Sequence, residues 1–167
     1  MRRILFVCHG NICRSTMAQF VMAELARRAG RSGEFELDSA ATSREELGNP
    51  PHPGTVRKLR AEGVPVGAHR ARQLRRDEYG HWDLIVYMDD ENERGLARIL
   101  GRDSAGGLDD PADKCAKLLS FVGEGSGLEP PARDSRGRVR DVADPWYTGD
   151  FEATYRDVLA GCKALLA

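Results

Sequence analysis

Cys8 and Arg14 are separated by five residues in the segment C-H-G-N-I-C-R-S, which runs from Cys8 to Ser15. An apolar run at 4–7 comes directly before this segment and a helical pattern directly after it, so we expect a loop between a strand end and a helix start. Backbone N–H groups in such a loop point into one concavity, and the helix dipole reinforces them, which suits a phosphate-sized dianion. The same field favours a thiolate, and the planar guanidinium of Arg14 matches two oxygens of a tetrahedral oxyanion. The pattern predicts a thiolate nucleophile at Cys8 that faces phosphorus.

The neighbours of Cys8 decide between this prediction and a simpler one. A cysteine after a buried strand is more often a small packing residue than a nucleophile. Gly10 and Asn11, however, tolerate the positive φ that a loop with inward-pointing amides needs. Ser15 places a hydroxyl where it can donate to a thiolate, and Arg14 would be out of place in a buried site without an anion. Together these residues favour the nucleophile.

Cys13 supports two interpretations that the sequence leaves open. It is either a buried packing residue at the helix start, or a resolving thiol that traps an oxidised Cys8 as a reversible disulfide.

Transfer of a phosphoryl group to a thiolate also needs an acid to protonate the leaving oxygen. Asp144, in V-A-D-P-W-Y-T-G-D-F, is the best candidate, because Pro145 holds the preceding backbone extended and two aromatic residues follow. An Asp before Pro is commonly only a turn former or a helix cap, but Trp146 and Tyr147 beside it could form a wall for a phenyl group. Asp150 is instead predicted to be the N-cap of the last helix.

Composition indicates a single soluble domain over residues 1–167. The chain has 31% charged and 41% hydrophobic residues, and its net charge of -1 gives no reason to expect a nucleic-acid or membrane partner. Its four cysteines are too few and too scattered for a secreted disulfide scaffold, and neither a signal peptide nor a membrane span is recognisable. We therefore expect a cytoplasmic protein, as a monomer or weak dimer.

Hydrophobic patterning predicts an α/β fold in which strands and helices alternate. Buried strands are predicted at 4–7, 35–37, 84–88 and 118–122, and helices at 16–29, 54–62, 91–100 and 151–166. This order implies right-handed crossovers and a parallel sheet with helices on both faces, a three-layer sandwich that binds ligands at the carboxyl ends of its strands. The segment 123–140 is rich in Gly, Pro and charge, and is predicted to be a long mobile loop.

From end to end, the chain resembles the low-molecular-weight protein tyrosine phosphatases. The loop matches the signature C-x5-R-S of this family. Further matches lie in order along the chain: D-S-A-A-T-S at 38–43, H-R-A-R-Q-L at 69–74, D-L-I-V-Y-M-D-D-E-N at 83–92 and D-P-W-Y at 144–147. The resemblance implies a doubly wound, flavodoxin-like fold with a central four-stranded parallel sheet.

The resemblance also implies a reaction in two steps without metal or cofactor. The Cys8 thiolate would attack the phosphorus of a phosphotyrosine-containing protein or a small aryl phosphate while Asp144 protonates the leaving phenolate, and Asp144 would then act as base in hydrolysis of the phosphocysteine. Arg14 would bind the phosphate together with a loop made of His9, Gly10, Asn11, Ile12, Cys13 and Ser15. Asn11, Ser15, His69 and Asp89 would support this loop, and the substrate cleft would be lined by Trp146, Tyr147, Glu45 and Glu46.

Three departures from the family pattern stand out. Thr16 replaces a usual proline, and its hydroxyl could cap or bond locally with little effect on the chemistry. The loop after Ser43 reads R-E-E-L-G where many relatives carry an aromatic residue, so Glu45 and Glu46 would repel acidic peptides. The segment 123–140 is longer than its counterpart and either gates the cleft or, more simply, is a tolerated surface insertion.

Three other functions remain alternatives. An arsenate reductase of this fold needs relay cysteines near the third strand, and 74–100 contains none, while Cys115 and Cys162 are poorly placed. A protein-arginine phosphatase would carry threonine in place of Ile12, whose branched side chain suits a phenyl ring better than a guanidinium. A catalytically silent phosphopeptide-binding module would not need both Cys8 and Asp144.

Overall fold

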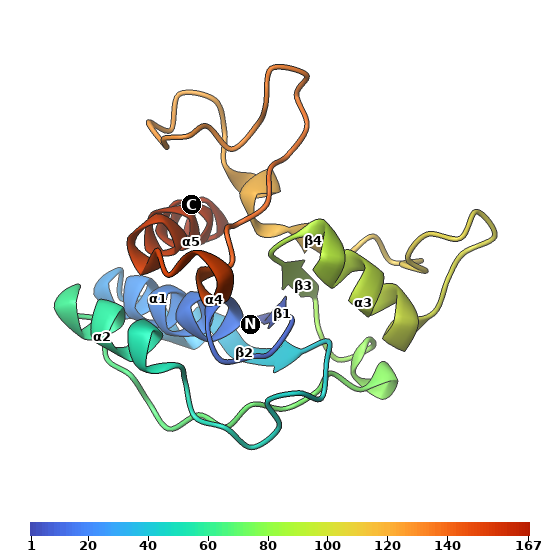
Figure 1. Ribbon diagram of the computed structural model, residues 1–167, viewed down its shortest axis with the longest axis horizontal. Coiled ribbons are helices and arrows are strands. Elements are labelled where there is room, and N and C mark those ends of the chain that lie inside the picture. The colour runs from blue at the N-terminus through green and yellow to red at the C-terminus, as the bar shows by residue number, and fades with distance from the viewer.

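Four parallel strands form one sheet in the order β2-β1-β3-β4, as Figure 1 shows for the structure, a computed structural model that describes residues 1–167. The strands are β1 (Arg2–Cys8), β2 (Phe35–Ala41), β3 (Leu84–Tyr87) and β4 (Cys115–Lys117). The helices are α1 (Arg14–Arg28), α2 (Pro53–Ala61), α3 (Asp90–Leu100), α4 (Pro145–Thr148) and α5 (Phe151–Leu166). The central strand β1 therefore has β2 on one side and β3 on the other.

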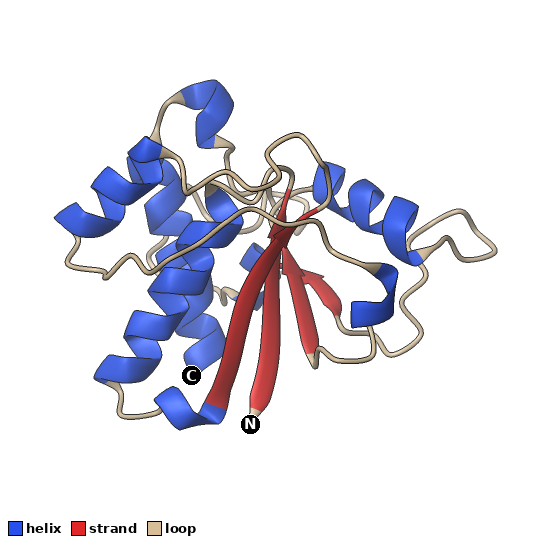
Figure 2. Ribbon diagram, turned by 90° about the horizontal axis from the view of Figure 1, so that it is seen from below, coloured by secondary structure: helices blue, strands red, loops and turns tan.

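Helices cover both faces of this sheet, which gives three layers (Figure 2). Alternate residues of β1 divide between two cores: Ile4 and Phe6 pack with α1 and α5, whereas Leu5 and Val7 pack with α3. Because both faces are buried, β1 is apolar at every position from Ile4 to Cys8 rather than at every second one. The predicted α/β sandwich with a four-stranded parallel sheet is confirmed.

The fourth strand lies three residues earlier than the sequence predicted. The apolar run at 118–122 forms a short 3₁₀ helix at Leu118–Phe121, and β4 is the less apolar Cys115–Lys117 before it. A short apolar run does not distinguish a strand from a buried helical turn, and here Leu118 and Leu119 are buried against α5. An edge strand that pairs with β3 through only three residues needs little apolar character.

The segment 123–140 contains no helix or strand, and its only ladder contact is an isolated antiparallel bridge between Arg133 and Val139. It projects from the body of the molecule between the 3₁₀ helix and α4 (Figure 1). Its mobility stays a prediction. No helix of the protein is long and apolar enough to span a bilayer.

Candidate active site

The loop between β1 and α1 lies at the carboxyl end of the central strand, which has β2 on one side and β3 on the other. β1 ends at Cys8 and α1 begins at Arg14, so the residues between them connect a strand end to a helix N-terminus, as the sequence predicted. The first turn of α1 holds no acidic residue, so none of its own carboxylates competes for its free N–H groups. This arrangement suits an anion at the point where α/β sheets commonly bind their ligands.

Asn11 holds the loop in shape from its centre. It has a positive φ of 59°, as expected. Its side-chain amide donates to Ser15 Oγ and Ser39 Oγ, each at 2.9 Å. Its carbonyl oxygen accepts a hydrogen bond from Thr16 Oγ1 at 3.0 Å and lies 2.9 Å from His69 Nε2. The strained turn is thus tied to β2, α1 and the segment before β3, and the Thr16 hydroxyl does bond locally.

Asn11 adopts the positive φ, whereas Gly10, which could also tolerate one, does not. Its lack of a side chain serves close approach instead: a Cβ here would lie 3.2 Å from Cγ of Glu46. The left-handed turn needs only one residue, and Asn11 supplies it.

Cys8 and Cys13 lie on the same loop but in different surroundings. Cys8 is 3% exposed, and its Sγ lies 3.1 Å from Ser15 Oγ. Cys13 is also buried, and burial, reinforced by the charge of Cys8, raises the pKa of its thiol to about 12. Both are free thiols, and the role of Cys13, as a packing residue or as a resolving thiol, stays a prediction.

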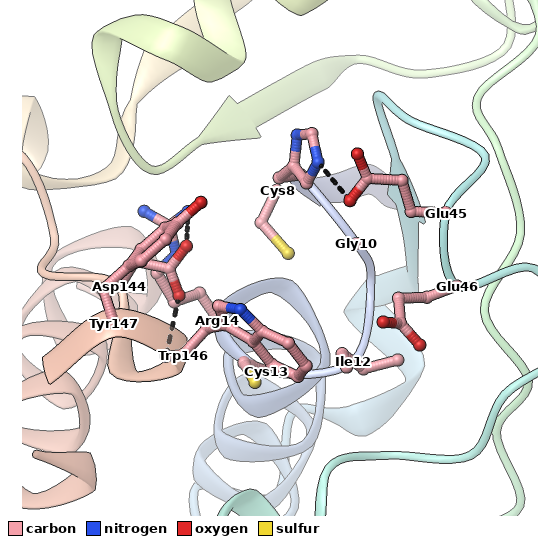
Figure 3. A pocket seen from close by; sticks show the side chains of 11 residues that line it. Cys8, Gly10, Ile12, Cys13, Arg14, Glu45, Glu46, Asp144, Trp146 and Tyr147 are labelled. Atoms are coloured by element: carbon pink, nitrogen blue, oxygen red, sulfur yellow. Dashed lines mark hydrogen bonds and ion pairs between the residues drawn. The ribbon is translucent and has the colours of Figure 1, made fainter. Parts of the chain in front are cut away.

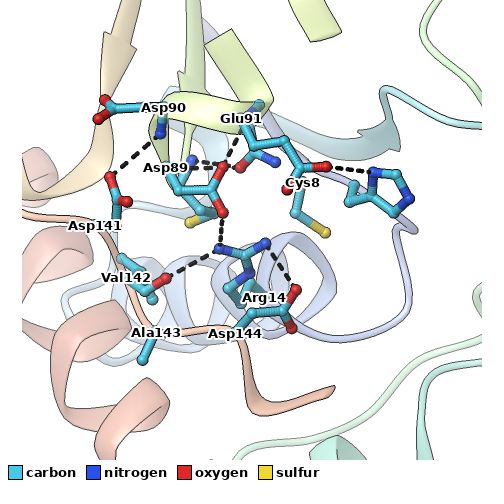
Figure 4. Close-up of polar contacts among 12 residues, drawn as sticks. Cys8, Arg14, Asp89, Asp90, Glu91, Asp141, Val142, Ala143 and Asp144 are labelled. Carbon is cyan, nitrogen blue, oxygen red and sulfur yellow. Dashed lines mark hydrogen bonds and ion pairs between the residues drawn. The ribbon is translucent and has the colours of Figure 1, made fainter. Parts of the chain in front are cut away.

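Arg14 is the centre of the polar contacts at the site, with only 2% of its surface exposed (Figure 4). Its Nη1 donates to Asp89 Oδ2 at 2.6 Å and to the carbonyl oxygen of Val142 at 3.0 Å, while Nη2 donates to Asp144 Oδ2 at 3.2 Å. Burial works against its charge, but the charges of Cys8, Asp89 and Asp144 outweigh burial and raise the pKa of Arg14. The guanidinium is therefore a fixed cation with a set orientation.

Asp144 both caps a helix and lies at the site, although the sequence presented these two roles as alternatives. Its Oδ1 accepts from the backbone N–H of Trp146 at 3.0 Å, which caps the short helix α4, while Oδ2 contacts Arg14. Its side chain is 24% exposed, so the carboxyl group remains reachable from the cleft. Asp150 accepts from the N–H of Ala153 at 2.9 Å and caps α5, as predicted.

These side chains border one cleft that encloses about 500 Å³, part of it open to solvent (Figure 3). One side is formed by Trp146 and Tyr147, which are 58% and 81% exposed, and the other by Glu45 and Glu46. The complete lining consists of Cys8, His9, Gly10, Ile12, Cys13, Arg14, Glu45, Glu46, Asp144, Trp146 and Tyr147. The cleft thus combines a floor formed by the loop with an aromatic wall and an acidic wall.

A sequence profile of the family described as low molecular weight phosphotyrosine protein phosphatase matches residues 3–167. The chain belongs to this family. The low molecular weight protein-tyrosine-phosphatase YfkJ of Bacillus subtilis is 37% identical to it over 100% of this chain and 95% of its own length. The human low molecular weight phosphotyrosine protein phosphatase is 31% identical over 99% of this chain and 94% of its own.

Solved structures agree with this membership. The crystal structure of YfkJ has a TM-score of 0.82 at 36% identity, covering 99% of this chain and 92% of its own. An arginine phosphatase from Drosophila has a TM-score of 0.72 at 22% identity, covering 99% of this chain and 96% of its own. At that identity the second likeness shows only a shared fold.

Contacts of two histidines, His9 and His52, were not predicted from the sequence. The ring of His9 lies between two carboxylates, 2.9 Å from Glu45 Oε2 and 3.4 Å from Glu91 Oε1. His52 stacks on Phe151 with ring centroids 5.2 Å apart and meets the edge of Trp146 at 5.9 Å. A histidine before the helix-starting Pro53 gives no signal of such contacts, because its aromatic partners lie far along the chain. No group of three or more His, Cys, Asp or Glu side chains converges as a metal site would require.

Proposed function

We propose that this phosphatase hydrolyses phosphotyrosine in proteins, and small aryl phosphates, through a phosphocysteine intermediate. The observation that carries the proposal is that Cys8, Arg14 and Asp144, from two distant parts of the chain, line one cleft. A nucleophile, a fixed cation and an acid together meet the needs of phosphoryl transfer to a thiolate. The exposed aromatic wall beside the acid suits a phenyl ring.

In the first step, the Cys8 thiolate attacks phosphorus opposite the tyrosine oxygen. The S–P bond forms, the P–O bond to tyrosine breaks, and protonated Asp144 gives its proton to the departing oxygen. Arg14 and the loop amides hold the three equatorial oxygens, whose charge they stabilise in the transition state. Ser15 Oγ lies 3.1 Å from Sγ. Once Cys8 is a thiolate, which cannot donate, the Ser15 hydroxyl is in position to donate to it.

In the second step, the Asp144 carboxylate takes a proton from water, and the resulting nucleophile attacks the phosphocysteine. The S–P bond breaks, inorganic phosphate leaves, and Cys8 returns to the thiolate while Asp144 is again protonated. Asn11, His69 and Asp89 act indirectly, because they contact the loop or Arg14 and not the cleft itself. The reaction needs a reduced Cys8, so we place the enzyme in a reducing compartment such as the cytoplasm. We propose that it acts there as a monomer or weak dimer.

The decisive test is hydrolysis of p-nitrophenyl phosphate and a phosphotyrosine peptide by wild type, Cys8→Ser and Asp144→Asn. Cys8→Ser should abolish turnover, and Asp144→Asn should lower kcat/KM for the peptide by roughly 10²–10⁴-fold, the usual contribution of a general acid. Asp150→Asn is the matched control, because it removes a neighbouring capping carboxylate that does not line the cleft. An inactive wild type, or equal effects of Asp144→Asn and Asp150→Asn, would contradict the proposal.

We propose that Ile12 makes the enzyme prefer phosphotyrosine over phosphoarginine as substrate. It lines the cleft, is 8% exposed, and places a branched apolar side chain where a guanidinium would need polar partners. We expect faster cleavage of a phosphotyrosine peptide than of a phosphoarginine peptide. Ile12→Thr should reduce the ratio of these two rates. Faster cleavage of the arginine form by the wild type would favour the protein-arginine phosphatase instead.

A further inference from the structure

Lys117, the last residue of β4, is a nearly buried cation whose every donor is used. Its side chain is 10% exposed. Its Nζ donates to Asp90 Oδ1 at 2.6 Å, to Asp141 Oδ1 at 2.8 Å and to the carbonyl oxygen of Val139 at 3.2 Å. An ammonium group has three protons, so these acceptors satisfy it completely.

The partners of Lys117 belong to the two segments that hold Arg14. Asp90 follows Asp89, which accepts from Arg14 Nη1, and Asp141 precedes Val142, whose carbonyl oxygen accepts from the same nitrogen. The segments also bond to each other, from the N–H of Asp90 to Asp141 Oδ1 at 3.2 Å, as Figure 4 shows. The start of α3 and the chain leading to Asp144 are thus joined by Lys117 as well as by Arg14.

The charges at this junction make Lys117 difficult to replace. Asp90 and Asp141 contact the same ammonium group, and without it they would be two close like charges. Burial works against the charge of Lys117, but the hydrogen bonds to Asp141 and Asp90 outweigh it and raise its pKa, so the cation persists at the pH of catalysis. Loss of the cation would remove the hydrogen bonds that join the two segments, and the repulsion between Asp90 and Asp141 would then push the segments apart.

We propose that Lys117 is a positioning residue that places the general acid, by fixing the segment 139–144 against the start of α3. This inference rests on the proposed function, since it assigns a cause to the position of Asp144. Lys117 does not line the cleft and does not contact Arg14, so it acts only through the backbone that carries Asp144. The long segment 123–140 enters the acid loop at this junction, and it offers no helix or strand that could hold the loop instead.

The test compares two esters that differ in their need for an acid: phenyl phosphate, whose phenolate must be protonated, and p-nitrophenyl phosphate, whose leaving group needs less help. Lys117→Met should lower kcat/KM for phenyl phosphate about tenfold and for p-nitrophenyl phosphate less than about threefold, part of the full effect of a general acid. The inhibition constant of inorganic phosphate should change little, because Arg14 and the loop remain. Lys117→Arg should recover most of the loss, since it keeps the positive charge and the N–H donors.

Lys114→Met is the matched control, because Lys114 donates to the carbonyl of Trp82 and lies over the ring of Tyr79, away from the acid loop. It should leave both esters unaffected. Asp141→Asn removes one of the two negative charges that contact Lys117. It should show the same larger loss of kcat/KM for phenyl phosphate, which keeps the test valid if Lys117→Met fails to fold. An active wild type with equal losses on both esters, or none, would overturn the role of Lys117. An inactive wild type would instead overturn the proposed function, and this role with it.

Discussion

At the scale of single residues, the site uses the same carboxylates for structure and for chemistry. Asp89 caps α3 by accepting from the N–H of Asn92 at 2.7 Å, and it also orients Arg14. Asp144 caps α4 and also contacts Arg14. Capping holds each carboxylate in a fixed position. Little further conformational entropy is therefore lost when the carboxylate orients the guanidinium of Arg14. An Asp at a helix start is therefore not evidence against a chemical role.

The two thiols of the loop should differ in reactivity. Iodoacetamide reacts with thiolates, and burial raises the pKa of the Cys13 thiol to about 12, so at pH 7 this thiol is almost entirely protonated. We expect alkylation of Cys8 first, with inorganic phosphate slowing it and Cys13 becoming labelled only as the pH rises. Peptide mass spectrometry measures both sites, and Cys8→Ser should remove the rapid phase. Faster labelling of Cys13 at pH 7 would contradict these assignments.

The acidic wall of the cleft should select among phosphopeptides by charge. Glu45 and Glu46 line the cleft opposite the aromatic side chains, and the Glu45 side chain is 70% exposed, so its field is screened by solvent and salt. We expect Glu45→Gln with Glu46→Gln to raise kcat/KM for peptides with acidic flanks by about threefold, less at high salt. Glu124→Gln, in the segment 123–140, is the control and should change nothing. No gain for acidic peptides would show that this wall does not contact the substrate.

The residues that the sequence revealed are those whose signal is local. Cys8 and Arg14 are close in sequence at a strand-to-helix junction, and Asp144 is next to Pro145 and two aromatic residues. Lys117 and Val142 gave no such signal. Lys117 reaches Asp90, which is 27 residues away, and Val142 acts through its carbonyl oxygen, which every residue type possesses. Contacts of this kind depend on the packing of distant segments and are visible only in the folded chain.

At the scale of elements, the predictions succeeded where burial and periodicity agreed. β1 and α1 were predicted within a few residues because each has one unambiguous pattern. The fourth strand was misplaced because its apolar neighbours Leu118 and Leu119 are buried by α5 and not by strand pairing. Gly161 of α5 lies so close that a Cβ there would be 2.4 Å from Cγ of Leu118. α4 is too short, at 4 residues, for any periodicity to indicate it.

At the scale of the whole molecule, one arginine anchors the end of the irregular segment 123–140 to the body of the protein. Arg140 makes a two-pronged contact with Asp157 of α5, at 2.7 Å and 2.6 Å, and it also donates to the carbonyl oxygens of Pro130 and Pro131. Asp157 is 4% exposed, so its carboxylate is nearly cut off from solvent. The same arginine thus folds the segment back on itself and joins it to the last helix, close to the acid loop.

Arg140→Met should therefore destabilise the protein by about 3 kcal/mol, because it leaves the Asp157 carboxylate buried without a partner. Urea unfolding measures the loss, and adding Asp157→Asn should recover part of it by removing the stranded charge. Arg138→Met is the matched control: Arg138 pairs with Asp134 at the surface and is 73% exposed, so its loss should cost less than about 1 kcal/mol. Equal stability of the Arg140→Met and Arg138→Met variants would show that the segment is not anchored through α5. Because the segment 123–140 contains no helix or strand, we also expect limited proteolysis of the wild type to cut within it before it cuts the rest of the chain.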